Sequence, residues 1–217
     1  NNGGDGLVIA RKLWQKGFRI QVFVVQFREK QTDEFLANLK RLKEFTNQIT
    51  ILDGNSELAD PEEDTIVIDA IFGTGIKNPP TGFVKDLIVQ INKMQLEVIS
   101  IDMPSGLPTD EAAKDREAII QAEHTLTFQA PKTALLLPDN EAFTGKLHII
   151  PIGLSAGFEQ EEISNTYYTD ASLLRPIYKK RKKFSHKGDF GHCLIMGGSY
   201  GKIGAAVLAT RAALNMG

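Results

Sequence analysis

The sequence predicts an α/β fold, a three-layer α/β/α sandwich around a mostly parallel sheet, over residues 1 to about 160. Short apolar runs alternate with helix-length segments along this stretch, which is typical of βαβ units. The runs are almost continuously apolar, as expected of strands that helices cover on both faces. Hydrophobic residues make up 42% of the 217 residues and charged residues 24%, so the chain is apolar enough to bury a core.

Helix-like periodicity occurs in three places in this region. Leu7 and Ala10 lie at helical spacing before Gly17, which predicts a helix over residues 7–15. Thr32 or Asp33 is suited to cap a second helix, which runs to about residue 45. A third helix is expected over residues 83–94, where the apolar side chains share one face.

Strand-like runs occur in six places around these helices. They are short and mostly apolar, and they cover residues 20–25, 49–52, 65–69, 97–102, 126–128 and 147–152. In open α/β sheets, ligands bind at the carboxyl ends of the strands. The loops that follow these strands are therefore expected to carry the functional site.

The pattern changes after residue 157. Acidic and polar residues are followed by a solid basic run at 179–183, so we expect a solvated linker over residues 161–183. A new unit is predicted over residues 184–217, with a strand at 192–196 and an Ala-rich helix at 204–215. One strand and one helix bury too little surface to form a core alone. We therefore expect these residues to open a second α/β domain.

Charge and composition argue against several classes of protein. The formal net charge of −2 gives no general attraction to nucleic acid, and no uncharged apolar run is long enough to cross a membrane. The single cysteine, Cys193, excludes an internal disulfide, and no Cys/His set suits structural zinc. We expect a cytoplasmic homo-oligomer. Because the chain begins with Asn1 rather than Met, we also expect a fragment.

Three clusters of residues suggest chemistry. Residues 1–6 (NNGGDG) precede a predicted helix, where backbone N–H groups exposed by glycines suit a phosphate group. Asp69 ends an apolar strand and is followed by the Gly-containing loop 73–82. Asp102 likewise ends an apolar strand before Ser105. Two such strand ends indicate a shared crevice.

Several familiar motifs are missing. Residues 73–78 lack the third glycine of a GxGxxG dinucleotide fingerprint. Residues 197–203 resemble a P-loop only loosely, because Ile203 stands where Ser or Thr is needed. The four histidines lack metal-ligand spacing and are expected to be structural or solvated.

The clusters together resemble the NAD(P)H-hydrate epimerase family, the N-terminal domain of YjeF-type proteins. The resemblance spans residues 1–155 and is carried by NNGGDGLVIARKL at 1–13, DAIFGTGIKNPPTG at 69–82, SIDMPSGL at 100–107 and TLTFQAPKTALLLP at 125–138. It implies a Rossmann-like sandwich. Residues 184–214 resemble the opening of an ADP- or ATP-dependent NAD(P)H-hydrate dehydratase domain, which has a ribokinase-like fold.

The resemblance implies a role in nicotinamide nucleotide repair. The epimerase of this family interconverts the R and S forms of hydrated NADH or NADPH, and the dehydratase accepts only the S form. Carried over by motif, the substrate-binding residues are Asn1, Asn2, Gly3, Gly4, Asp5, Gly73, Thr74, Gly75, Ile76, Lys77, Asn78, Pro79 and Asp102. The implied ligands of a potassium ion are Asn2, Asp69 and Ser105.

The residue types are consistent with these implied roles. Amide, carboxylate and hydroxyl oxygens are hard ligands that suit an alkali or alkaline-earth cation. Epimerisation at a carbon that bears a hydroxyl group needs proton transfer, and our hypothesis is that Asp102 is the general acid/base. Lys132 matches a family position, and we expect a structural role for it.

Two other functions compete with this interpretation. One is a non-catalytic binding module on the same fold, since a relative of this domain is known for binding an apolipoprotein. Intact Asp69, Asp102 and Ser105 favour an enzyme instead. The other is an ordinary nicotinamide-dependent dehydrogenase, and the missing GxGxxG motif counts against it.

Overall fold

The computed structural model describes residues 3–27, 31–54, 58, 61–62, 64–76, 78–154, 166–178 and 180–216. The chain divides after Ser164 into two compact units. This boundary falls inside the segment 161–183 that the sequence predicts to be a linker. No helix among the described residues is long and apolar enough to cross a membrane.

The first unit confirms the α/β class and the parallel pairing of its strands. Its elements are α1 (Gly4–Gln15), β1 (Val22–Val25), α2 (Asp33–Lys43), β2 (Ile49–Leu52), β3 (Ile66–Asp69), α3 (Phe83–Lys93), β4 (Glu97–Ile101), β5 (His124–Phe128), α4 (Glu141–Thr144) and β6 (Lys146–Ile150). Every described strand pair is parallel.

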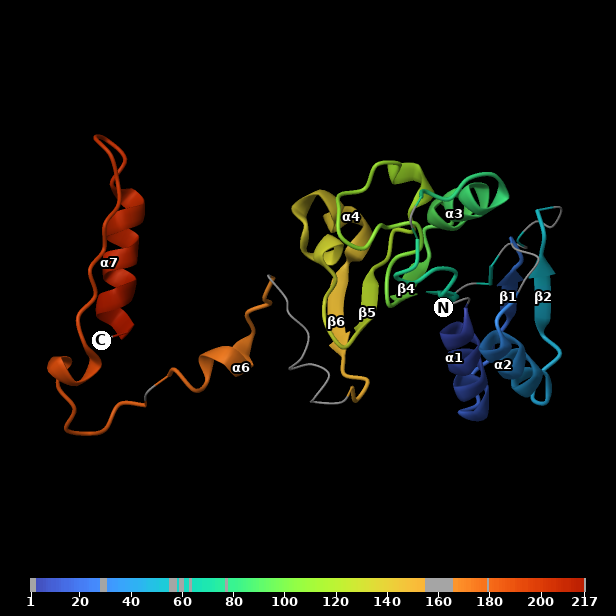
Figure 1. Cartoon of the computed structure of the whole chain (residues 1–217), viewed down its shortest axis with the longest axis horizontal. Helices are drawn as coiled ribbons and strands as arrows, with labels where there is room; N and C mark the ends of the chain where they lie inside the picture. Colours follow the sequence, from blue (N-terminus) through green and yellow to red (C-terminus); the bar gives the residue numbers. More distant parts are fainter. Residues whose placement is uncertain are drawn as a thin grey trace. The chain divides into compact units, whose positions relative to one another are not determined.

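The strands are divided between two sheets, whereas one sheet was expected. β1 pairs with β2, and the other four strands pair in the order β3-β4-β5-β6. Figure 1 shows the two sheets apart. In the described residues, the sheets do not pair with each other but share a core: Ile88 of α3 lies in one buried cluster with Leu52 of β2 and Val98 of β4. Helix α3 therefore holds both sheets to a common core.

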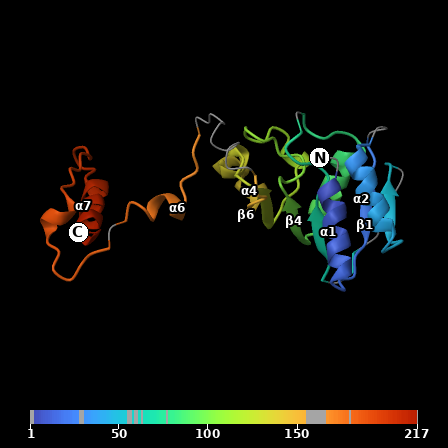
Figure 2. The same cartoon turned by 60° about the horizontal axis from the view of Figure 1, so that its bottom comes forward.

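A second buried cluster fixes the first two helices on the two-stranded sheet. Leu7 of α1 and Leu42 of α2 pack with Val24 of β1, and Figures 1 and 2 both show α1 and α2 side by side. The predicted cap of α2 is confirmed, since the backbone N–H of Phe35 donates to Thr32 Oγ1 at 3.3 Å. A third cluster, which includes Met103 and Phe143, lies under the loops that follow β4 and β5.

The second unit contains α6 (Ala171–Leu174), a 3₁₀ turn at Lys187–Phe190 and α7 (Gly204–Met216). The predicted helix at 204–215 is confirmed, but the predicted strand at 192–196 is wrong, because these residues have no regular structure. The described part of this unit offers no strand for them to pair with, and Leu194 and Met196 are more than 80% exposed. An isolated strand cannot satisfy its backbone hydrogen bonds or bury its side chains.

Candidate active site

The carboxyl ends of β3 and β4 meet, as the sequence predicts. Asp69, the last residue of β3, pairs in register with Ser100 of β4. The chain then turns through Asp102 to Ser105, and the backbone N–H of Ser105 donates to Asp69 Oδ2 at 2.8 Å. A side chain at Gly106 would collide with the carbonyl oxygen of Ala118, so the glycine lets this turn close. The two predicted clusters thus form one site.

Asp69 is a buried carboxylate surrounded by hydrogen-bond donors. Its oxygens accept from Ser100 Oγ at 2.7 Å, Ser105 Oγ at 2.5 Å and the backbone N–H of Ile71 at 3.3 Å, besides the Ser105 N–H. Burial raises the pKa of Asp69, and these hydrogen bonds oppose the rise. Within the described part of the chain, no basic side chain forms an ion pair with it.

The oxygens gathered here are of the type that hard cations bind. The carboxyl group of Asp69 and the hydroxyl group of Ser105 lie together, and both are oxygen ligands. Of the three implied potassium ligands, Asp69 and Ser105 lie together, and Asn2 falls outside the described residues. No cluster of three or more His, Cys, Asp or Glu side chains occurs among the described residues, so the donor set is not that of a zinc site.

Asp102 has a strained backbone and a fixed carboxylate. Its φ of 68° lies in the left-handed region, which a residue with a Cβ adopts at a cost. Its Oδ1 accepts from Lys132 Nζ at 2.5 Å and from the backbone N–H of Phe128 at 3.3 Å. The side chains of Asp102 and Lys132 are each 16% exposed. The pair joins the loop after β4 to the loop after β5.

The first turn of α1 lies beside the same strand ends. A Cβ on Gly6 would come within 2.8 Å of the Ala70 side chain, directly after β3. Gly3 has a φ of 79° and faces the Ala70 carbonyl oxygen. Burial and the negative charge of Asp102 raise the pKa of Asp5. Of the predicted residues, Gly3 therefore lies beside Ala70 and Asp5 lies near enough to Asp102 to be affected by its charge, whereas Asn1 and Asn2 lie outside the described residues.

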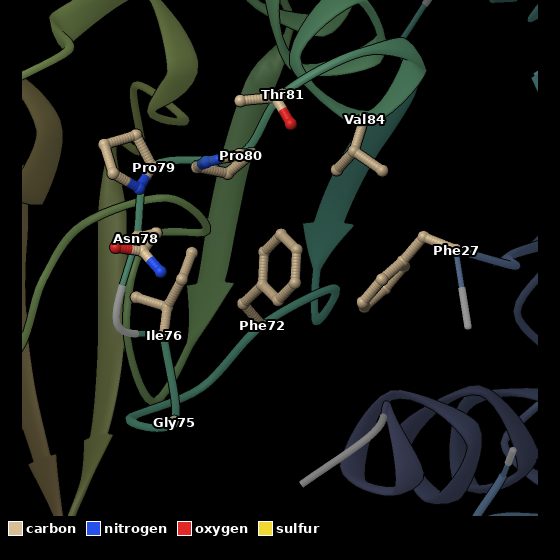
Figure 3. Close-up of a pocket in the computed structure, with 9 residues that line it drawn as sticks. All are labelled: Phe27, Phe72, Gly75, Ile76, Asn78, Pro79, Pro80, Thr81 and Val84. Atoms are coloured by element: carbon tan, nitrogen blue, oxygen red, sulfur yellow. The ribbon is translucent and has the colours of Figure 1, made fainter.

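The loop after β3 forms one wall of a cavity of about 560 Å³. Figure 3 shows the Phe72 ring between Phe27 on one side and Ile76 and Asn78 on the other. The rings of Phe27 and Phe72 are 5.0 Å apart between centroids and tilted by 55°. Of the predicted substrate-binding loop, the residues that line this cavity are Gly75, Ile76, Asn78 and Pro79.

Gly73 and Thr74 of the predicted loop lie outside the lining of this cavity. Gly73 lies against Asp102, since a Cβ there would be 3.4 Å from Oδ2 of the aspartate. The carbonyl oxygen of Thr74 accepts from Thr109 Oγ1 at 3.0 Å, which anchors the loop. Lys77 is outside the described residues. The loop therefore reaches from the Asp102 carboxylate to the cavity.

The sequence does not indicate a binding or catalytic role for three residues that lie at this site, Phe27, Phe72 and Lys132. Phe27 and Phe72 resemble ordinary core aromatics, although Phe72 lies within the DAIFGTG motif. Lys132 was noted, but a structural role was expected. One feature of the sequence does indicate that Lys132 lies at the site: it follows a strand and stands beside a proline. The loops that follow parallel strands meet at one edge of the sheet.

Two histidines also meet in the structure. His124 of β5 and His148 of β6 lie side by side, with Nδ1 of the first 3.1 Å from Nε2 of the second. One ring must donate this hydrogen bond and the other must accept it. This contact links the neighbouring strands β5 and β6.

Comparison with known proteins gives a consistent result. A family model described as YjeF-related protein N-terminus matches residues 1–134. The bifunctional NAD(P)H-hydrate repair enzyme Nnr of Moorella thermoacetica is 35% identical over the whole chain, and that of Escherichia coli K12 is 31% identical. The chain covers 42% and 41% of these two relatives, so it spans about two fifths of their length.

A solved structure supports the fold independently. The crystal structure of the yeast protein ynu0 superposes with a TM-score of 0.61 and 22% sequence identity. The match covers 78% of this chain and 70% of the yeast chain. At this identity the likeness supports the fold alone.

Proposed function

Because this chain belongs to the family of YjeF-related protein N-termini, we propose that its first unit is an NAD(P)H-hydrate epimerase. It would interconvert the R and S forms of hydrated NADH or NADPH. The observation that carries the proposal is the Asp102 carboxylate, which is held at a strand end between the first turn of α1 and the loop at Gly73. A substrate group bound there would contact the Asp102 carboxylate, which can transfer a proton, and two glycine-containing backbone segments.

The phosphates and the bases of a dinucleotide have separate places in this proposal. The backbone around Gly3 and Gly4 would hold the diphosphate, because the N-terminus of a helix attracts anions. The cavity behind Phe72 would hold a flat base, since aromatic walls favour stacking. The hydrated nicotinamide ring would then face Asp102. A near-neutral protein is consistent with this arrangement, because no basic surface is required.

Proton transfer is the step assigned to the protein. The reacting carbon carries a hydroxyl group next to the ring nitrogen, and epimerisation proceeds by ring opening or by loss and return of water. In either route a proton moves to or from the substrate, and Asp102 is the group that takes and returns it. The hydrogen bonds from Lys132 and from the Phe128 N–H would keep the carboxylate in place during the transfer.

Asp69 and Ser105, with Asn2, would hold a potassium ion. The ion would supply positive charge near the diphosphate. Asp69→Ala should then remove the response of the reaction rate to potassium. Rates that are equal in potassium and in sodium-only buffer, for the unaltered protein, would contradict this assignment.

The direct test of the proposed function starts from the purified R epimer of hydrated NADH. The protein should convert it to an equilibrium mixture with the S epimer, which proton NMR distinguishes. A non-catalytic binding module would leave the R epimer unchanged while still binding it. Hydride transfer to NAD is not expected, and its detection would instead indicate a dehydrogenase.

The complete protein is proposed to have a second activity. Residues 184–217 resemble the opening of the ADP- or ATP-dependent dehydratase domain, and relatives that extend beyond this chain are named bifunctional repair enzymes. The dehydratase would consume the S epimer that the first unit supplies. A homo-oligomer and a cytoplasmic location stay predictions, which sedimentation and cell fractionation test.

A further inference from the structure

We propose that Lys132 is a positioning residue for the reaction: its ammonium group anchors one oxygen of Asp102 so that the other oxygen faces the substrate. The inference rests on the proposed epimerase function and deepens it, because it assigns a role to a residue for which only a structural role was expected. Lys132 would act through Asp102 and would not itself exchange a proton with the substrate.

The ammonium group of Lys132 is held in a single orientation. Besides Asp102 Oδ1, its acceptors are Thr127 Oγ1 at 3.0 Å and the carbonyl oxygen of Phe128 at 3.0 Å. An ammonium group has three hydrogens, so these three acceptors use all of its donors. Thr127 is fully buried in β5, which makes the sheet itself the support for the lysine.

The two oxygens of the Asp102 carboxylate have different surroundings. Oδ1 accepts the hydrogen bonds from Lys132 Nζ and from the Phe128 N–H. Oδ2 is the oxygen that lies beside Gly73, where a Cβ would be 3.4 Å away, so the missing side chain leaves room next to this oxygen. A carboxylate bound through one oxygen keeps the lone pairs of the other directed at the substrate. This division is what a general acid/base needs.

The carboxylate of Asp102 lies where two turns meet, and Lys132 connects these turns. Asp102 and Gln129 both have positive φ values, 68° and 60°, at equivalent points after β4 and β5. The two turns lie side by side, and the Lys132–Asp102 ion pair spans them. Asp5, the other charged side chain found to influence this site, carries the same sign as Asp102 and would repel it. Lys132 opposes that repulsion.

A purely structural role makes a different prediction. Buried ion pairs contribute little net stability on average, and their replacement by apolar groups is often tolerated. Lys85 and Asp115 provide a control, because their ion pair of 2.8 Å does not include Asp102; its side chains are 30% and 35% exposed. If Lys132 served only the fold, the variants that lack Lys132 or Lys85 could differ in their free energy of unfolding. Both folded variants would then have the same turnover.

The experiment compares the steady-state kinetics of Lys132→Met, Lys132→Arg, Thr127→Val and Lys85→Met with those of the unaltered protein. We expect Lys132→Met to lower kcat roughly 100-fold, with KM changed less than about threefold, since a misplaced catalytic group costs that much. Lys132→Arg should recover part of the loss, and Thr127→Val should lower kcat to a smaller extent. Lys85→Met should be normal.

Three results would overturn the proposal. They are a normal kcat for Lys132→Met, a raised KM at unchanged kcat, and a Lys132→Arg variant no more active than Lys132→Met. If Lys132→Met does not fold, as circular dichroism would reveal, Lys132→Arg and Thr127→Val decide alone: normal kcat in both would refute the role.

A crystal structure of Lys132→Met separates this inference from the proposed function. If the unaltered protein does not epimerise the hydrate, the proposed function fails, but the anchoring of Asp102 is still measurable. The Asp102 carboxylate should then rotate away from the Phe128 N–H in the variant. An unmoved carboxylate would refute the anchoring role whatever the activity.

Discussion

At the scale of single residues, the site depends on carboxylates in contrasting surroundings. Asp69 is buried among hydroxyl and N–H donors without a described basic partner. Asp102 is half-buried and paired with Lys132. The first environment suits binding a cation, and the second suits moving a proton at a fixed place.

Asp102→Asn tests the proton-transfer role. The amide keeps the shape of the side chain but cannot take up the substrate proton, so kcat should fall about 10²- to 10⁴-fold. Binding of the oxidised dinucleotide, measured by calorimetry, should change little because the phosphate and base contacts remain. A variant with near-normal turnover would make Asp102 a binding residue only.

Phe72→Ala tests the assignment of the cavity. Loss of one aromatic wall should raise KM for the hydrated dinucleotide about 3- to 10-fold, which corresponds to a single aromatic contact. The hydrate of the mononucleotide, which lacks the second base, should show no such change. Phe45→Ala, at an exposed residue outside the cavity, is the control. Equal effects on both substrates would place the second base elsewhere.

At the scale of elements, the turns that follow the strands position the site residues as much as the strands do. The chain at Gly106 has a φ of 96° and passes so close to Ala118 that a Cβ would lie 1.9 Å from its carbonyl oxygen. This close approach sets the place of Ser105, and through it the hydrogen bonds to Asp69.

Gly106→Ala should therefore lower the free energy of unfolding far more than the same substitution at a glycine that has a positive φ but no nearby atoms. Gly17 has a similar φ of 86°, but no atom lies near the position of its Cβ. Gly17→Ala should cost only about 1–2 kcal/mol, the strain of the backbone itself. Gly106→Ala should cost clearly more, because backbone atoms must also move. Urea unfolding of both variants measures the difference, and equal losses would contradict the close approach.

The sequence predicted these elements better than it predicted their contacts. Periodicity and apolar runs located α1, α2, α3 and all six strands, and the acids at two strand ends located Asp69 and Asp102. The sequence indicates that the loops of Lys132 and Asp102 lie at one edge of the sheet. It does not indicate that the two side chains pair, because they are 30 positions apart and the turn at Gln129 lies between Lys132 and β5. The expected strand at 192–196 was wrong because an apolar pattern does not supply the neighbour that a strand needs.

At the scale of the whole molecule, the core belongs to the first unit. All three buried clusters are built from residues between Leu7 and Leu147. In the second unit, the apolar side chains of α7, such as Leu208 and Leu214, are more than 60% exposed. The buried clusters around the site therefore consist of residues of the first unit.

Removal of residues 165–217 should thus leave the first unit intact. Its thermal unfolding midpoint should change by less than about 4 °C, the shift that roughly 1 kcal/mol produces in a domain of this size. Its rate of epimerisation should also be retained. Scanning calorimetry and the NMR assay measure both properties. A large loss in either would show that the second unit supports the first.

The division of the sheet has a consequence for ligand binding. The first turn of α1 belongs to the part built on β1 and β2, whereas Asp102 belongs to the part built on β3 to β6. A dinucleotide held at both places would connect the two sheets across the seam between them, which in the described residues is closed by packed side chains and not by strand pairing. Its binding energy would then add to the stability of the entire unit by mass action. Amide hydrogen exchange should slow on both sides of the seam together when the ligand binds.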